Sequence, residues 1–180
     1  TNHTEALALL LQQGDYEGAK AYLSTLTKTI AANTTIMNTH NPLLDALLSK
    51  KYEEASRKGV MVYFDLPDLR DMPMDQTDLV IVLSNLLNNA IEAAAQADPP
   101  EVYVRMRKSE DEVVLSVRNR VKKDLNLADG QLPRISQKGA GHGFGLWNVR
   151  DVLKKYGGEY TISCRGCWFR FTCTIPLRKL

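Results

Sequence analysis

The stretch S-N-L-L-N-N-A-I-E-A-A, residues 84–94, decides the fold of this 180-residue chain. It lies in a pattern that predicts a helix over residues 75–97, with Asp75 as the residue that caps its first turn. Apolar positions recur every three or four residues and predict one buried face: Leu79, Leu83, Leu86, Leu87, Ala90, Ile91 and Ala94. Asn85 and Asn89 line up beside that face, one helical turn apart.

Two interpretations of these asparagines stay open at the level of the pattern. As ordinary helix residues they face solvent or bond locally, because Asn competes with the hydrogen bonds of a helix. As ligands they offer neutral carboxamide oxygens on a rigid support. Such acceptors suit a Mg²⁺ ion that keeps most of its waters and takes its negative charge from phosphates.

A second informative stretch, K-G-A-G-H-G-F-G-L at residues 138–146, leads directly into a helix expected over 144–156. Alternating glycines leave backbone N–H groups accessible, and a helix N-terminus adds unpaired donors and a favourable dipole. These features suit a phosphate group. The glycine spacing matches neither a Walker A loop nor a Rossmann turn, and a flexible linker has a similar composition.

The remaining chain predicts an α/β domain over residues 39–180, preceded by a helical hairpin over residues 1–38. Its other expected elements are a helix at 42–58, strands at 60–64, 102–106, 113–117, 159–164 and 168–175, and a long polar loop at 120–142. Gly14-Asp15 breaks the hairpin, and Tyr16, Ala19, Leu23, Leu26 and Ile30 form an apolar stripe on its second helix. We expect this stripe to pack against a second copy or against the following domain.

Composition excludes several classes of function. Lys plus Arg number 23 against 21 Asp plus Glu, without a basic block, so nucleic acid is not expected as a partner. No apolar run approaches the roughly 20 residues of a membrane span. Three cysteines in a chain of this length do not indicate a disulfide framework, and this favours a cytoplasmic protein. Cys164-Arg-Gly-Cys167 has metal-site spacing, but without a second pair we interpret it as two strand ends around an Arg165-Gly166 turn.

Residues 85–94, N-L-L-N-N-A-I-E-A-A, resemble the asparagine box of the GHKL ATPases, and residues 141–149, G-H-G-F-G-L-W-N-V, resemble their second glycine box. The order and separation of the two boxes are similar as well. Within that superfamily the chain looks like the sensor histidine kinases related to quorum-sensing peptide receptors. The resemblance implies a Bergerat-type α+β sandwich, with a mixed, mostly antiparallel sheet covered by helices on one face.

The resemblance also implies an ATP site. By its position in the asparagine box, Asn89 corresponds to the Mg²⁺ ligand of the family, and Asn85 corresponds to the neighbouring residue of the nucleotide site. The glycine-box residues near the phosphates are Gly141, His142, Gly143, Gly145 and Leu146, with Lys138 as a cationic partner. Asn119 replaces the aspartate that accepts a hydrogen bond from adenine in most relatives. The glycines that follow that aspartate are absent, and an uncharged acceptor predicts a weaker hydrogen bond.

The reaction that the resemblance implies is transfer of the γ-phosphoryl group of ATP to a histidine. Asn85 stands where hydrolysing relatives carry a glutamate base, and an amide cannot take a proton. His3 is followed by Thr4 and lies close to Gly14, which does not match the family's acceptor. We therefore expect the acceptor to precede Thr1 and the present chain not to phosphorylate itself. The expected partners are a second copy, bound through the N-terminal helices, and a response regulator. The parent protein is expected at the cytoplasmic side of a membrane.

Two alternatives remain at this stage. One is a GHKL ATPase or an anti-sigma-type serine kinase, against which Asn85 and the helical hairpin argue. The other is a nucleotide-sensing dimerisation module without turnover, which Asn119 and the absent glycines allow.

Overall fold

The computed structural model describes residues 9–23, 37–72, 74–124 and 145–177. The chain divides into two compact units, Thr1–Met37 and Asn38–Leu180. In the described part of the first unit, helical residues 9–12 and 16–23 are separated by a turn at Gly14, whose φ is +70°. Asp15 caps the second helical segment by accepting a hydrogen bond from the Gly18 N–H (2.8 Å). The predicted break at Gly14-Asp15 is confirmed.

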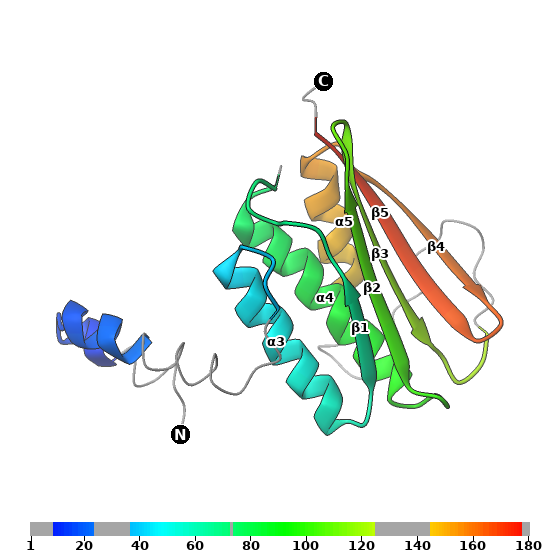
Figure 1. The fold of residues 1–180 in the computed structure, drawn as a ribbon, viewed down its shortest axis with the longest axis horizontal. Coiled ribbons are helices and arrows are strands. Elements are labelled where there is room, and N and C mark those ends of the chain that lie inside the picture. The colour runs from blue at the N-terminus through cyan, green and yellow to red at the C-terminus, as the bar shows by residue number, and fades with distance from the viewer. Residues whose placement is uncertain (1–8, 24–36, 73, 125–144, 178–180) are drawn as a thin grey trace. The chain divides into compact units, whose positions relative to one another are not determined.

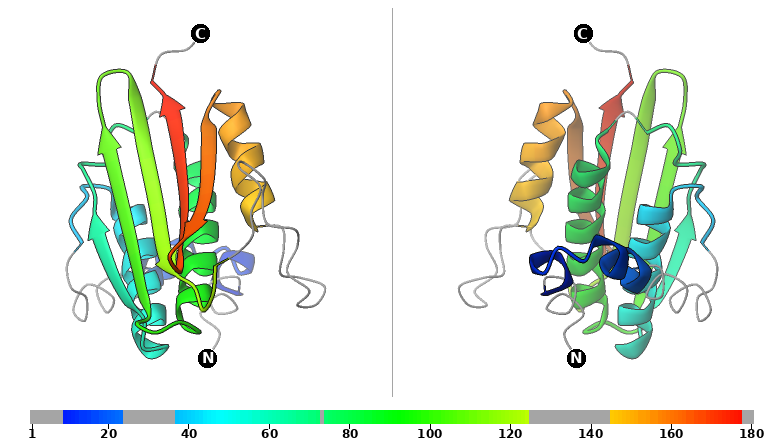
Figure 2. Two further views of the ribbon diagram at one scale, coloured as in Figure 1. Left: turned by 90° about the vertical axis from the view of Figure 1, so that its right-hand side faces the viewer. Right: turned by 90° about the vertical axis from the view of Figure 1, so that its left-hand side faces the viewer.

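The second unit is built on one five-stranded sheet with the order β1-β2-β3-β5-β4. Its strands are β1 (Met61–Asp65), β2 (Glu101–Lys108), β3 (Glu112–Arg120), β4 (Glu159–Arg165) and β5 (Trp168–Pro176). β1 runs parallel to β2, and all other pairs are antiparallel. Helices α3 (Pro42–Arg57), α4 (Gln76–Ala94) and α5 (Gly145–Lys155) cover one face (Figures 1 and 2). The expected mixed, mostly antiparallel sheet with helices on one face is confirmed.

Local chemistry explains where the helices begin and end. Asn41 caps α3 by accepting from the Leu44 N–H, and Pro42 provides a preset φ at its first turn. Asp75 caps α4 through the Thr77 N–H (2.8 Å). The helix ends three residues before the predicted residue 97. Residues 95–97 instead close a tighter turn, in which the N–H groups of residues 96 and 97 bond to carbonyls three residues back.

The core lies between α4 and the inner face of the sheet. All seven residues of the predicted apolar face of α4 are buried, none more than 3% exposed. They meet alternate strand residues that are equally buried: Val102, Val104, Met106, Val113, Leu115, Val117, Phe171, Cys173 and Ile175. α4 contacts β2 and β3 on one side and lies between α3 and α5 on the other. The asparagine-bearing helix is therefore the central support of the domain.

One turn differs from its sequence-based prediction. β4 ends at Arg165 and β5 starts at Trp168, so the turn residues are Gly166 and Cys167, with φ values of 58° and 59°. Two central residues with positive φ define the hairpin turn whose twist matches that of the strands. The predicted Arg165-Gly166 turn is wrong by one residue, and Cys167 lies in the turn itself. Neither Cys164 nor Cys167 is part of a disulfide bond.

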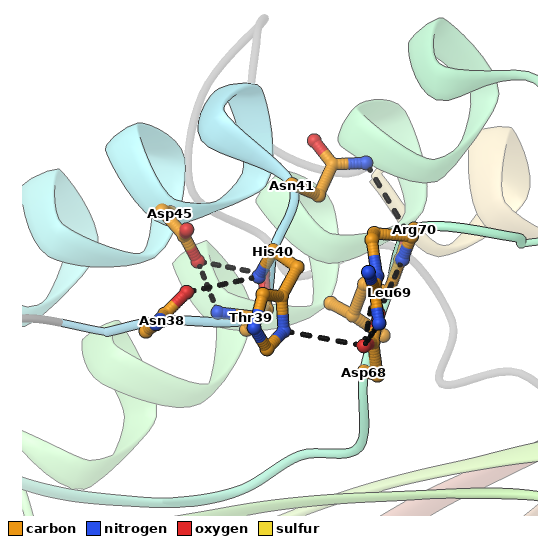
Figure 3. A network of polar contacts seen from close by, with 8 residues as sticks. All are labelled: Asn38, Thr39, His40, Asn41, Asp45, Asp68, Leu69 and Arg70. Atoms are coloured by element: carbon orange, nitrogen blue, oxygen red, sulfur yellow. Dashed lines mark hydrogen bonds and ion pairs between the residues drawn. The ribbon is translucent and has the colours of Figure 1, made fainter.

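The segment that enters the second unit is held by side chains of α3 and of the loop after β1 (Figure 3). Thr39 is buried, and both its N–H and its hydroxyl donate to the Asp45 carboxylate (2.9 and 2.6 Å). Its carbonyl accepts from the Leu69 N–H (2.8 Å), and the amide of Asn41 donates to the Leu69 carbonyl (3.4 Å). Residues 39–41 are thus hydrogen-bonded both to α3 and to the loop after β1.

His40 extends this network on its exposed side (Figure 3). It has a φ of 60°, and its Nδ1 lies 3.2 Å from an oxygen of Asp68. The same carboxylate accepts three side-chain hydrogen bonds and one backbone hydrogen bond from Arg70, which lower the pKa of Asp68 to about 2. Within the ranges that the structure describes, no helix is both long enough and apolar enough to span a membrane.

Candidate functional site

The first residue of α5 lies directly against the two aligned asparagines of α4. A methyl group placed on the Cα of Gly145 would lie 3.0 Å from Asn85 Oδ1 and 3.4 Å from Asn89 Nδ2. These distances are at or below ordinary van der Waals contact, so the absence of a side chain at Gly145 allows the two helices to approach this closely. The structure therefore brings together three predicted site residues from two stretches that are about 50 residues apart in the sequence.

Hydrogen bonding orients the Asn85 amide toward α5. Its Nδ2 donates to the Ile81 carbonyl one turn earlier (2.8 Å), and Asn85 is half-buried. This bond directs Oδ1 toward the N-terminus of α5. Asn89 lies one turn further along α4 and is exposed, so its carboxamide is accessible from solvent. Leu146, the next predicted site residue, is half-buried in the first turn of α5.

The far end of α5 is attached to the start of α4. The hydroxyl of Tyr156 donates to Asp78 Oδ2 (2.5 Å) and accepts from the Asp75 N–H (3.1 Å), and Lys155 Nζ donates to the same carboxylate oxygen (2.6 Å). The Lys155 hydrogen bond, followed by that of Tyr156, lowers the pKa of Asp78, and the Asp78 hydrogen bond raises the pKa of Lys155. With Gly145 beside Asn85 at one end and Tyr156 beside Asp78 at the other, α5 runs antiparallel to α4.

Sequence reasoning missed this attachment. Asp78 lies in the first turn of the helix predicted over residues 75–97, and Tyr156 is the last residue of the helix predicted over residues 144–156. The available signal was a tyrosine at a helix end together with an acidic residue in the first turn of another helix. Sequence separation hid the pairing, because the two residues are 78 positions apart in the sequence.

Asn119 lies on the inner face of the sheet near the end of β3. It is only 3% exposed, and its Nδ2 donates to the Arg120 carbonyl (2.9 Å), which leaves the side-chain oxygen as an acceptor. Its neighbours across the sheet are Val102 on β2 and Phe169 on β5. A buried carboxamide between apolar strand residues is suited to bind a flat polar ring by one specific hydrogen bond.

The chain after β3 is tied to the β4–β5 turn. The Val121 N–H donates to the Cys167 carbonyl (3.0 Å), and the Asp124 carboxylate accepts from the N–H groups of Gly166 and Cys167. These bonds fix the backbone on the C-terminal side of Asn119. The remaining predicted residues, His3, Lys138, Gly141, His142 and Gly143, lie outside the described residues.

The described residues can hold a phosphate-bearing ligand with a divalent cation. The N-terminus of α5 offers N–H donors and the positive end of a helix dipole. Two carboxamides stand beside it, and the absence of a Cβ at Gly145 lets them lie this close to the helix end. Neutral amide oxygens fit Mg²⁺ only when the ligand supplies the negative charge, and a polyphosphate does so. The donor set therefore fits Mg-ATP better than a free metal ion.

Comparison with known proteins identifies the family. The model of the GHKL domain matches residues 74–176. This range includes α4, which carries Asn85 and Asn89, and α5, which begins at Gly145. The chain belongs to the GHKL family. It corresponds to the ATP-binding catalytic domain of sensor histidine kinases, as the similar proteins show.

Among curated proteins, the chain is similar to sensor protein CitS of Bacillus subtilis, with 26% identity over 99% of this chain and 34% of CitS. It is also similar to sensor protein PhoQ of Escherichia coli O157:H7, with 29% identity over 66% of this chain and 24% of PhoQ. The chain thus spans about a third or less of these relatives.

Solved structures agree with this assignment. The catalytic domain of histidine kinase ThkA superposes with a TM-score of 0.59 and 26% identity, covering 74% of this chain and 91% of that one. The match to the histidine kinase AdeS of Acinetobacter baumannii covers 99% of this chain and 96% of AdeS, with a TM-score of 0.54 and 15% identity. At that identity the second likeness concerns the fold alone.

Proposed function

We propose that this chain binds Mg-ATP between α4 and α5 and supplies the γ-phosphoryl group to a histidine within a dimeric sensor kinase. The observation that carries the proposal is the contact of Gly145 with Asn85 and Asn89. It places the N-terminal end of α5 beside two carboxamide side chains, with Asn85 Oδ1 and Asn89 Nδ2 as the nearest atoms. Family membership and the sensor kinases among the relatives support the same conclusion.

Each residue has a distinct part in the proposed site. The Asn89 carboxamide oxygen binds Mg²⁺, and Asn85 faces the phosphates beside it. Asn119 accepts a hydrogen bond from the adenine amino group. The backbone N–H groups at the start of α5 hold the phosphate oxygens, and Gly141, His142, Gly143 and Lys138 complete the phosphate site. Leu146 packs under the nucleotide. Mg²⁺ supplies charge neutralisation between the phosphates.

Transfer to histidine, instead of hydrolysis, follows from the chemistry of Asn85. Its amide nitrogen already donates a hydrogen bond to the Ile81 carbonyl, and an amide has no basic site to take a proton from water. A neutral imidazole needs no such base near pH 7, so positioning and charge neutralisation suffice. The GHKL ATPase alternative therefore lacks the group that it requires at this position.

We further propose that none of the three histidines of the chain is the phosphoacceptor. His40 is in contact with Asp68 in the segment that enters the domain, and His142 belongs to the glycine box. His3 lacks the acidic neighbour that accompanies the family's acceptor. Incubation with γ-labelled ATP should leave the chain unlabelled, and acid-labile, base-stable label on it would contradict this part of the proposal.

Partners follow from the first unit. Leu9, Leu11, Tyr16 and Leu23 are between 47% and 71% exposed, which is unusual for large apolar side chains on a short helical segment. We propose that a second copy covers them in a homodimer, and that a response regulator receives the phosphoryl group. The parent protein would then act at the cytoplasmic side of a membrane.

A titration with a fluorescent ATP analogue tests the nucleotide site. The unaltered chain should bind it more tightly with Mg²⁺ than without. Asn89→Ala should remove most of that Mg²⁺ dependence, because the variant lacks the proposed ligand. Asn88→Ala is the matched control, since Asn88 is an exposed neighbour on the same helix. Absence of Mg²⁺-dependent binding in the unaltered chain would instead favour a module without turnover.

A further inference from the structure

The outer face of the sheet, away from the three helices, carries an ordered group of arginines and aromatic rings at one end. Tyr103, Arg118, Arg120, Arg165, Trp168 and Arg170 form this group, which we call the arginine–aromatic patch. Strand alternation places all of them on the side opposite the buried core residues, and no described element of the second unit covers that side (Figure 2). The patch plays no part in the nucleotide site proposed above.

Aromatic rings lie against the guanidinium groups of two arginines of the patch, Arg118 and Arg120. The guanidinium carbon of Arg118 lies 4.6 Å from the ring centre of Tyr103 and 4.5 Å from that of Trp168. The guanidinium carbon of Arg120 lies 4.2 Å from the Trp168 ring centre. A guanidinium stacked on a ring face keeps its N–H groups directed outward along its edge. These edges are available for paired hydrogen bonds to an oxyanion, at little further cost in side-chain entropy.

The patch carries more positive charge than its own carboxylates balance. Its four arginines are accompanied by the carboxylate of Glu101, which lies 3.8 Å from Arg120 Nε. That nitrogen is buried and has no hydrogen-bond partner within the described part of the chain. Asp124, the acidic residue that follows β3, already accepts hydrogen bonds from the β4–β5 turn.

Strand register adds a second, independent observation. Arg118 on β3 and Arg170 on β5 are direct partners across an antiparallel pair. Like charges in such positions destabilise a sheet. The other half of the same face shows the opposite arrangement, because Arg105 and Arg107 share the carboxylate of Asp65 (3.0 and 2.5 Å). An unbalanced arginine pair is therefore a feature of the patch and not of the whole face.

We propose that the arginine–aromatic patch is a docking surface for an acidic segment of a partner protein. Arginine, tyrosine and tryptophan are the residues most enriched at the energetic centres of protein interfaces. Charge complementarity selects the occupant: carboxylates of the partner pair with the guanidinium edges of Arg118, Arg120 and Arg170. A nucleic acid or an anionic membrane fits less well, because Asp65, Glu112 and Glu159 share the same face and would repel an extended polyanion.

Fluorescence anisotropy of the intact chain with a labelled octaglutamate peptide tests the proposal. At about 50 mM salt the peptide should bind, and an octaglutamine peptide should not. Arg118→Gln and Arg170→Gln should each weaken binding about tenfold, since each removes charge-assisted hydrogen bonds. Arg107→Gln is the matched control with the same charge change on the same face, and it should stay within about twofold of the unaltered chain.

Nuclear magnetic resonance of the unaltered chain provides a measurement that needs no variant. Addition of octaglutamate should shift the backbone amide signals of the β3 and β5 residues in the patch. The proposal is overturned if the peptide does not bind, if Arg107→Gln weakens binding as much as Arg118→Gln, or if the shifted signals lie elsewhere. Tighter binding of a 20-base-pair DNA duplex or of phosphatidylglycerol vesicles at the patch would also overturn it, in favour of a phosphate-binding surface.

Discussion

Replacement of Gly145 by alanine is the most informative single change at the α4–α5 contact. The new methyl group would lie 3.0 Å from Asn85 Oδ1. Ordinary carbon–oxygen contacts are longer by several tenths of an ångström, so the Asn85 amide must move away. It cannot move freely, because its Nδ2 is hydrogen-bonded to the Ile81 carbonyl at 2.8 Å. The methyl group therefore strains or breaks that bond and shifts an acceptor at the proposed phosphate site.

The expected magnitude comes from two opposing effects. Loss of a partly buried hydrogen bond costs about 0.5–1.5 kcal/mol, and the displaced oxygen weakens the contact to the ligand further. Alanine in place of glycine at a helix position stabilises the folded chain by up to about 1 kcal/mol. Nucleotide affinity should therefore fall about tenfold, or about 1.4 kcal/mol, while the melting temperature changes little because the two effects on folding largely cancel.

A double-mutant cycle checks the cause of this loss. The dissociation constant of a fluorescent ATP analogue is measured with Mg²⁺ for the unaltered chain, Gly145→Ala, Asn85→Ala and the double variant. If the methyl group acts through Asn85, Gly145→Ala should cost much less in the Asn85→Ala background, with a coupling energy of about 1 kcal/mol. An equal loss of affinity in both backgrounds would refute the steric argument, as would full affinity of Gly145→Ala.

Three further outcomes are expected for folding stability. Tyr156→Phe removes the hydroxyl that joins the end of α5 to Asp78, so the free energy of unfolding in urea should fall by about 1 kcal/mol. An unchanged free energy of unfolding would mean that this hydrogen bond does not hold the helices together. Gly158→Ala places a methyl group 2.9 Å from a backbone carbonyl oxygen of β5, and the melting temperature should drop clearly more than for Tyr156→Phe; an equal or smaller drop would contradict the predicted backbone clash. The pKa of Asp68 is lowered to about 2 by its hydrogen bonds from Arg70, so its contribution to stability is present above about pH 4 and is lost as the pH falls toward 2. Between pH 5 and pH 2 the melting temperature should therefore fall less steeply for Asp68→Asn than for the unaltered chain. An equal fall of the melting temperature in both chains would contradict this assignment.

Most secondary structure could be predicted from sequence because its causes are local. Asn41-Pro42 and Asp75 begin their helices as expected, and the seven apolar positions of α4 are all buried. The two errors also have local causes. Alanine-rich residues 95–97 could continue α4 but close a tighter turn before Pro99, and the hairpin at residues 166–167 accepts a positive φ at a cysteine.

Within the proposed nucleotide site, the residue types could be predicted from the sequence but their arrangement could not. Two asparagines one turn apart and a glycine-rich stretch before a helix each indicate a chemistry, because helix period and backbone donors are local properties. Their contact depends on the antiparallel packing of α5 on α4 and on the Tyr156–Asp78 link at its far end. The positions of Lys138 and of the remaining glycine-box residues stay predictions.

Periodicity, capping residues and composition predicted most of the elements, the buried face of α4 and the two stretches that carry the proposed chemistry. Tertiary structure alone decided the strand order β1-β2-β3-β5-β4, the parallel pairing of β1 with β2 and the group of arginines around Trp168. Trp168 packs on the guanidinium groups of Arg118 and Arg120 on the outer face. The physical reason is that the pairings of β1 with β2 and of β3 with β5 join strands that lie far apart in the sequence, and no local pattern in the chain encodes those pairings.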